Sequence, residues 1–258
     1  MRIVRGQSQI TADSSHFRLL YHMKKRWIIA NWKSYKTRDN VKEWLEYLAE
    51  SQLPTSDDVE VIVCPPYLFL AEMATYIVEK NLSIKLGVQD ISQFGEGSYT
   101  GAINVDQASD YVDYAIVGHS ERRKHFHEND DDTLEKTKVL LEKNITPILC
   151  ISDLKQLEYY LSKGTLLSDN AEKIIFVYEP PGAISGGGTF HPEDPESANA
   201  NAKKISEMIG KEIITLYGGS VNPDNAAELF SKEAIDGGLI GKASLDPASF
   251  LSLIRAAM

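Results

Sequence analysis

The chain has 258 residues, 43% of them hydrophobic and 25% charged, which is the composition of a folded globular protein. A formal net charge of −10 argues against binding to nucleic acid or to an anionic membrane, because such proteins present a basic surface. No apolar run reaches the roughly 18 residues of a membrane span. Cys64 and Cys150 fall in apolar segments, where we expect buried, reduced thiols and a cytoplasmic location.

Residues 1–22 differ from the rest of the chain. They include Arg2, Arg5 and Arg18 and lack the apolar core of a secretory signal, and a regular pattern begins only after Met23. We expect residues 1–22 to be an N-terminal extension, either disordered or the product of an upstream start. The alternative is an additional ordered element. Residues 23–258 contain no Pro/Ser/Gly-rich linker, so we expect them to form one domain.

Short apolar, β-branched segments recur eight times after Met23, at residues 27–31, 59–64, 84–88, 115–117, 147–151, 174–178, 213–217 and 239–240. Segments with apolar residues three and four apart predict helices at 41–50, 67–80, 131–143, 154–163, 197–209, 223–230 and 247–256. Strands that alternate with helices and lack a polar face are typical of a parallel sheet buried on both sides. Eight such units predict an α/β fold, the closed (β/α)8 TIM barrel in a single domain, with an open doubly wound sheet as the alternative.

Three predicted strands are followed by residues that can move protons. Lys33 comes after the first strand beside Asn31, and its ammonium can stabilise negative charge on a substrate oxygen. His119 opens a helix-like turn whose amides favour a neutral imidazole. Glu179 directly follows the sixth strand, where a carboxylate can remove a proton. Each residue taken singly is more often structural or solvated, so the argument depends on the barrel bringing all three to one rim.

Glycine clusters near the last three strands predict a phosphate site, because backbone N–H groups beside glycine are accessible to an anion. The clusters are residues 185–188, 218–220 and 237–241. No set of residues has metal-ligand spacing, and we expect His125 and His127, beside Glu128 in a charged stretch, to be solvated. Nucleophile-elbow, P-loop and dinucleotide-binding motifs are absent from the sequence.

From about residue 25 onward, the chain resembles the triosephosphate isomerase family. The resemblance rests on four strings in the family's order: Ala30-Asn31-Trp32-Lys33, Val117-Gly118-His119-Ser120-Glu121-Arg122-Arg123, Tyr178-Glu179-Pro180 and Tyr217-Gly218-Gly219-Ser220-Val221. It implies a cofactor-independent and metal-independent isomerase of glycolysis and gluconeogenesis. Such an enzyme interconverts dihydroxyacetone phosphate and D-glyceraldehyde 3-phosphate through an enediolate.

The resemblance also implies roles for individual residues. Glu179 would be the base that acts on carbon, and His119 would shuttle the proton between the oxygens. Lys33 would stabilise the enediolate, with Asn31 holding its geometry and Glu121 pairing with its ammonium. The substrate would be bound by Asn31 and Lys33, and its phosphate by Ser185, Ser220, Gly241 and Lys242. A homodimer is implied as well, in which residues 93–101 enter the partner and Thr100 touches the partner's site.

The chain departs from the family's pattern in the loop that closes over the substrate. The family has a tryptophan where this chain has Gly182, and the glutamate that bonds this tryptophan is Asp153 here. Residues 180–188 read Pro-Pro-Gly-Ala-Ile-Ser-Gly-Gly-Gly, and each added glycine raises the cost of ordering the loop. One alternative function is therefore a catalytically impaired relative that binds a small phosphorylated ligand. Another is a different sugar-phosphate isomerase on the same barrel.

Two further departures concern the dimer and the phosphate site. Ala102 stands where the family has a glutamate that pairs with an arginine at the interface, for which Arg122 is the candidate here. We therefore expect a weaker dimer contact at this point. Lys242 replaces a glycine of the phosphate site, which the site tolerates because the backbone amide does the binding.

Overall fold

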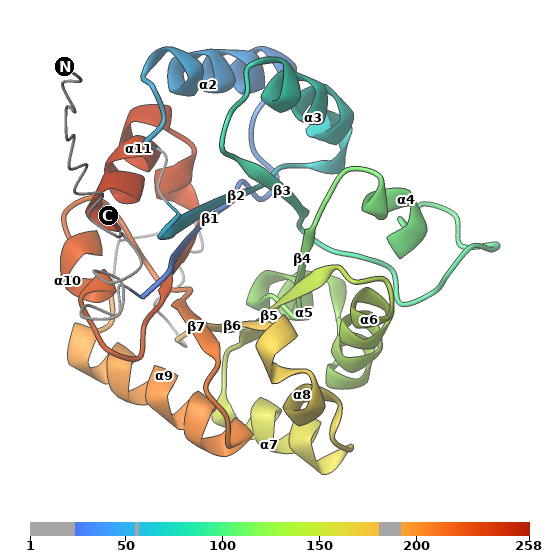
Figure 1. Ribbon diagram of the computed structural model, residues 1–258. Helices are drawn as coiled ribbons and strands as arrows, with labels where there is room; N and C mark the ends of the chain where they lie inside the picture. Colours follow the sequence, from blue (N-terminus) through green and yellow to red (C-terminus); the bar gives the residue numbers. More distant parts are fainter. Residues whose placement is uncertain (1–23, 55–56, 181–191) are drawn as a thin grey trace, which may run out of the picture.

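The computed structural model describes residues 24–54, 57–180 and 192–258. Within this part of the chain, eight parallel strands form a closed barrel in sequence order, with β1 paired to both β2 and β8. The helices lie outside the strands as a ring (Figure 1). The prediction of a closed (β/α)8 barrel is confirmed, and the open-sheet alternative is wrong. Residues 1–22 lie outside the described residues, so their assignment as an extension stays a prediction.

The strands agree with their predicted positions to within two residues. They are β1 Arg26–Asn31, β2 Val59–Cys64, β3 Lys85–Val88, β4 Tyr114–Val117, β5 Thr146–Ile151, β6 Ile175–Tyr178, β7 Ile214–Tyr217 and β8 Gly237–Ile240.

The helices that the apolar spacing predicted are all present. They are α2 Arg38–Glu50, α3 Leu70–Glu79 (preceded by the 3-10 helix η1 Tyr67–Phe69), α6 Asp130–Glu142, α7 Leu154–Ser162, α9 Pro195–Ile209, α10 Ala226–Phe230 and α11 Pro247–Ala256. The short elements α4 Val105–Ser109, α5 Ser120–Phe126, α8 Leu166–Asp169, η2 Ala171–Lys173 and η3 Lys242–Ser244 complete the described helices. Of these, α4 and α8 were not predicted, because four or five residues are too few to show a helical period.

Apolar side chains fill both sides of the barrel wall. On β1, Ile29 belongs to a cluster inside the barrel with Ile62, Ile148 and Leu216, whereas Ile28 belongs to the larger cluster between strands and helices. Each of these five side chains is fully buried, which stabilises the fold by about 1.5–3 kcal/mol apiece. Burial on both faces explains why the strands lack an alternating polar pattern.

Polar side chains cap several helices where they leave the rim. Thr37 forms a capping box with Asn40 at the start of α2, and Asn129 does the same with Asp132 at the start of α6. Asp246 caps α11, which has Pro247 in its first turn. Such caps satisfy amides that have no partner within the helix, and so they fix where each rim loop ends.

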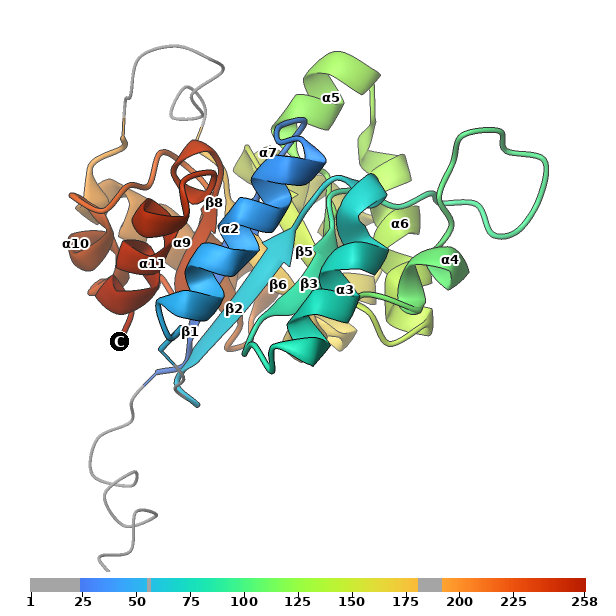
Figure 2. The same cartoon turned by 90° about the horizontal axis from the view of Figure 1, so that it is seen from above.

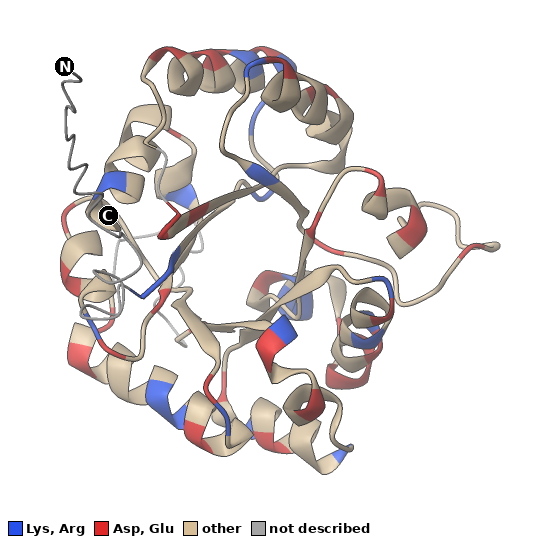
Figure 3. Ribbon diagram, in the orientation of Figure 1, with Lys and Arg blue, Asp and Glu red and all other residues tan. Residues whose placement is uncertain are grey.

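Charged residues of both signs are interspersed over the outer helices, as Figure 3 shows. The segment between β3 and α4 projects away from the barrel (Figures 1 and 2). Within it, the rings of Phe94 and Tyr99 stack with centroids 4.4 Å apart, and each side chain is about half exposed. In the described part of the chain, no helix has the length and apolar content to cross a membrane.

Candidate active site

The carboxyl ends of the strands meet at one rim, toward which the strand arrows in Figure 2 point. The structure brings Lys33, His119, Glu121 and Glu179 into direct contact with one another there, and Asn31 contacts the backbone of Lys33. Three predicted phosphate residues follow β7 and β8 at the same rim: Ser220, Gly241 and Lys242. Ser185 lies outside the described residues.

Lys33 is held both at its ammonium and along its backbone. Its Nζ lies 2.7 Å from Glu121 Oε1. The backbone has a φ of 51°, a region that costs a non-glycine residue about 1–3 kcal/mol. Asn31 Oδ1 accepts a hydrogen bond from Lys33 N at 3.0 Å, and Gln89 Nε2 donates to Lys33 O at 2.9 Å. These bonds fix the strained backbone, so the ammonium is placed before any ligand arrives.

His119 is buried at the amino end of α5 and accepts a hydrogen bond there. The N–H of Glu121 donates to His119 Nδ1 at 3.2 Å. A nitrogen that accepts a hydrogen bond carries no proton, so the ring proton is assigned to Nε2 of a neutral imidazole. Nε2 lies 3.0 Å from Glu179 Oε1. The imidazole can therefore offer its proton at the edge that faces the carboxylate.

Glu179 is completely buried, and its two carboxylate oxygens differ in their contacts. Oε2 accepts a hydrogen bond from the N–H of Ser120 at 2.9 Å and a longer one from Ser152 Oγ at 3.4 Å. Oε1 is close to His119 Nε2, but the N–H is not aligned with it, and Oε1 has no hydrogen bond within the described residues. Oε2 is therefore tethered by two donors, and Oε1 has lone pairs that can accept a proton.

Glycines make room for this arrangement. A Cβ on Gly218 would lie 3.0 Å from Glu179 Cγ, and a Cβ on Gly241 would lie 3.1 Å from Lys33 Cε. The predicted cluster 237–241 divides at the end of β8, since Gly237 lies within the strand and packs against Trp27. Gly237 and Gly238 are therefore strand residues, and Gly241 is the glycine of this cluster that follows β8 at the rim.

Comparison with known proteins shows which family combines these features. Residues 26–257 match the sequence model of the family described as triosephosphate isomerase. The chain belongs to the triosephosphate isomerase family.

Curated members of the triosephosphate isomerase family align along almost the whole of the barrel. The triosephosphate isomerase of Mycoplasmoides gallisepticum is 39% identical, over 90% of this chain and 98% of that protein. Those of Thermus thermophilus and Fusobacterium nucleatum are 38% and 37% identical, each over 91% of this chain and over 100% and 99% of their own lengths.

The arginine that was expected to lose a partner in this triosephosphate isomerase barrel has two within its own chain. Arg122 Nη2 lies 2.8 Å from Asp90, and its Nε lies 2.7 Å from Glu128. Lys136 Nζ pairs with the same two carboxylates at 2.7 and 2.6 Å. Burial raises the pKa of Glu128, but the hydrogen bonds from Lys136 and Arg122 outweigh it and leave this pKa below its usual value. The missing carboxylate at Ala102 therefore does not leave Arg122 without a counter-charge.

In the charged stretch between the end of α5 and the start of α6, the exposure of the two histidines was predicted and the burial of Glu128 was not. His125 and His127 are exposed, as expected, whereas Glu128 is buried among the cations described above. In residues 24–54, 57–180 and 192–258, no group of three His, Cys, Asp or Glu side chains is placed to hold a metal ion.

Two residues that directly follow β5 bear on the site. Asp153, whose family counterpart bonds the closing loop, caps α7 by accepting from Lys155 N at 2.9 Å. Gly182 lies outside the described residues. Ser152 was not predicted as a site residue, yet its hydroxyl reaches the Glu179 carboxylate. The sequence signal was its position directly after a strand, and no motif marked it.

Proposed function

We propose that this chain interconverts dihydroxyacetone phosphate and D-glyceraldehyde 3-phosphate, with Glu179 as the base that acts on carbon. Membership of the triosephosphate isomerase family, a family of glycolytic isomerases, assigns the reaction class. The observation that carries the role of Glu179 is its Oε1, which is buried, lacks an aligned hydrogen bond within the described residues and lies 3.0 Å from a histidine nitrogen. A general base needs an available lone pair that can come within hydrogen-bond reach of the proton it removes.

The proposed reaction needs one proton on carbon and one on oxygen. Glu179 removes a proton from the carbon beside the carbonyl, and the electron pair of the C–H bond moves to form the enediolate. His119 donates its Nε2 proton to the oxygen that gains charge and recovers a proton from the neighbouring hydroxyl. Glu179, now protonated, returns its proton to the adjacent carbon. All atoms and electrons balance without an oxidant or cofactor.

Lys33 supplies the positive charge for the intermediate in this proposal. Its ammonium lies beside Glu121 before the reaction, so it needs no reorganisation when negative charge develops on the substrate. The phosphate would be held by backbone N–H groups of the rim, at Ser185, Ser220, Gly241 and Lys242. The Lys242 side chain adds a cation to this group.

We also propose a homodimer formed through the projecting segment, residues 93–101, with Thr100 reaching the partner's site. Exposed apolar side chains support a protein interface here: Leu68 and Phe126 are 89% and 67% exposed, in addition to the half-exposed Phe94 and Tyr99. A cytoplasmic location is proposed because Cys64 and Cys150 are free, buried thiols.

A substrate panel tests the proposed reaction. We expect rapid turnover of both triose phosphates and at most weak activity on pentose and hexose phosphates. Preference for a longer sugar phosphate would contradict the triose assignment. Phosphate binding without turnover would instead favour an impaired relative whose glycine-rich loop fails to close.

A further inference from the structure

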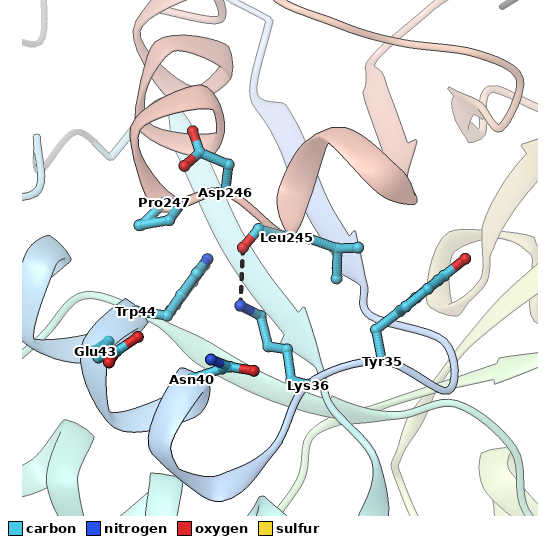
Figure 4. A pocket seen from close by; sticks show the side chains of 8 residues that line it. All are labelled: Tyr35, Lys36, Asn40, Glu43, Trp44, Leu245, Asp246 and Pro247. Atoms are coloured by element: carbon cyan, nitrogen blue, oxygen red, sulfur yellow. Dashed lines mark hydrogen bonds between the residues drawn. The ribbon is translucent and has the colours of Figure 1, made fainter.

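Lys36 lies three residues after Lys33 and crosses from the first rim loop to the last. Its Nζ donates a hydrogen bond to the backbone oxygen of Leu245 at 2.8 Å, as Figure 4 shows. Its backbone has a φ of 74°, in the left-handed region that side chains other than glycine avoid. A strained backbone that places a charged donor on one carbonyl indicates a specific contact.

The amine of Lys36 is also held by aromatic rings. Nζ lies 4.9 Å from the centroid of the Trp32 ring and 5.9 Å from that of Trp44. Burial lowers the pKa of Lys36, against the opposing effect of Asp246 and Glu43. The Lys36 ammonium is thus partly buried and directed at the turn after β8. Partial burial strengthens both its cation–π contacts and its hydrogen bond.

That turn contains the amides proposed to bind phosphate. Within it, the N–H of Ser244 donates to Gly241 O at 3.0 Å, and the N–H of Leu245 donates to Lys242 O at 3.2 Å. These two hydrogen bonds hold residues 241–245 together as one structural unit. Trp44 Nε1 donates to Ser244 O at 3.1 Å, next to the carbonyl that Lys36 holds. Lys36 and Trp44, which both follow β1 in the chain, therefore hold two successive carbonyls of the unit, those of Leu245 and Ser244.

The unit also contacts Lys33 directly. Gly241 packs against the Lys33 side chain so closely that a Cβ there would be 3.1 Å from Cε. A shift of the unit relative to the first loop would change the distance between the Lys33 ammonium and the Gly241 and Lys242 amides. A ligand that spans both groups would then bind less well.

We propose that Lys36 is a positioning residue that holds the phosphate-binding turn, residues 241–245, in register with Lys33. This inference rests on the proposed function, because it takes the Gly241 and Lys242 amides as the phosphate donors. Lys36 touches no reacting atom. It acts through Leu245, and its expected effect is on binding of the phosphate group.

The test compares Lys36→Met, which keeps the stem and loses the donor, with Lys36→Arg. The cavity beside Lys36, about 500 Å³ and lined also by Asn40 and Pro247, has room for the guanidinium. For Lys36→Met, we expect KM and the inhibition constant of inorganic phosphate to rise about threefold to tenfold, the equivalent of one hydrogen bond. kcat should stay within about twofold of wild type, and Lys36→Arg should restore most of the phosphate affinity.

Lys42→Met is the matched control, since Lys42 lies on the exposed face of α2 and pairs only loosely with Glu46, at 3.8 Å. It should leave every constant unchanged. Wild-type KM and phosphate inhibition in Lys36→Met would overturn the proposal. So would a fall in kcat and thermal midpoint without a change in phosphate affinity, because that pattern indicates general loss of packing.

An NMR titration with inorganic phosphate separates this proposal from the proposed function. It follows the Gly241 and Lys242 amides and needs no turnover. If the wild-type chain does not isomerise triose phosphates but these amides shift with phosphate, and shift less in Lys36→Met, the positioning role stands and the proposed function fails. If the amides respond equally in both proteins, the positioning role fails whatever the turnover.

Discussion

The two oxygens of the Glu179 carboxylate have unequal contacts, which suits the role of base proposed for this residue. The Ser120 amide and the Ser152 hydroxyl both hold Oε2, and Oε1 lacks an aligned donor within the described residues. The hydroxyl of Ser152 therefore helps the Ser120 amide to fix the orientation of the carboxylate. This contact follows from the pairing of β5 with β6, which sets Ile151 opposite Tyr178 and so places the next residues side by side.

Replacing Ser152 by alanine tests this contact. kcat/KM should fall about twofold to fivefold, because a long hydrogen bond to a charged group contributes about 0.5–1 kcal/mol and its loss leaves the carboxylate less well oriented. Ser162→Ala is the control, since the Ser162 hydroxyl bonds the Tyr159 carbonyl on the exposed side of α7. An unchanged kcat/KM in a folded Ser152→Ala protein would show that Ser152 does not position the carboxylate.

At the scale of single residues, the sequence identified groups that sit directly after a strand. Lys33, His119 and Glu179 were predicted because each follows an apolar segment and carries a group suited to proton transfer. Gln89 was missed because its importance comes from reaching across to the Lys33 carbonyl. The burial of Glu128 was not predicted, because it depends on the ion pair with Lys136 on the next helix. A contact between two distant segments cannot be predicted from the local spacing of residue types along the sequence.

Among the elements, the passage from β4 into α5 is the most constrained, because His119 must leave the strand facing the rim. Gly118 makes this turn with a φ of 69°. A Cβ there would lie 2.8 Å from Thr133 Cγ2 on α6 and 3.3 Å from the Cys150 carbonyl on β5. The close approach of three elements requires glycine at this point.

Gly118→Ala should lower the free energy of unfolding by about 1–3 kcal/mol from backbone strain alone, and the clash should add to it. We also expect kcat to fall, because the next residue is His119. Gly210→Ala provides the comparison: Gly210 has a φ of 73° at the end of α9 but open space around it. Equal losses of stability in the two variants, measured by urea unfolding, would rule out the packing constraint at Gly118.

Most of the elements were predictable because long helices and buried strands carry their period in the sequence. The exceptions have a physical reason. The helices α4 and α8 are too short to show a period, and the two glycines that open β8 look like a turn although Gly237 packs within the strand. The barrel itself followed from counting eight strand and helix units, whereas the rim contacts had to come from the structure.

For the whole molecule, the proposed dimer predicts a change of mass. Phe94→Ser should yield monomers in light scattering after gel filtration, with far-UV circular dichroism unchanged, because the exposed ring stacks on Tyr99 at the projecting segment. Turnover should fall in parallel, since Thr100 is proposed to complete the partner's site. Tyr47→Ser, on the outer helix α2, is the control and should stay dimeric. A monomeric wild-type protein with full activity would contradict the proposal.

In the proposed reaction, a tethered, buried Glu179 carboxylate removes the carbon-bound proton of a triose phosphate. Glu179→Gln keeps the size and the Ser120 contact of the side chain but removes the base. The measurement is kcat/KM for D-glyceraldehyde 3-phosphate in the wild type and this variant, with circular dichroism to confirm the fold. We predict a loss of about 100-fold to 10,000-fold, the usual contribution of a general base. Equal rates in two equally folded proteins would show that Glu179 is not the base.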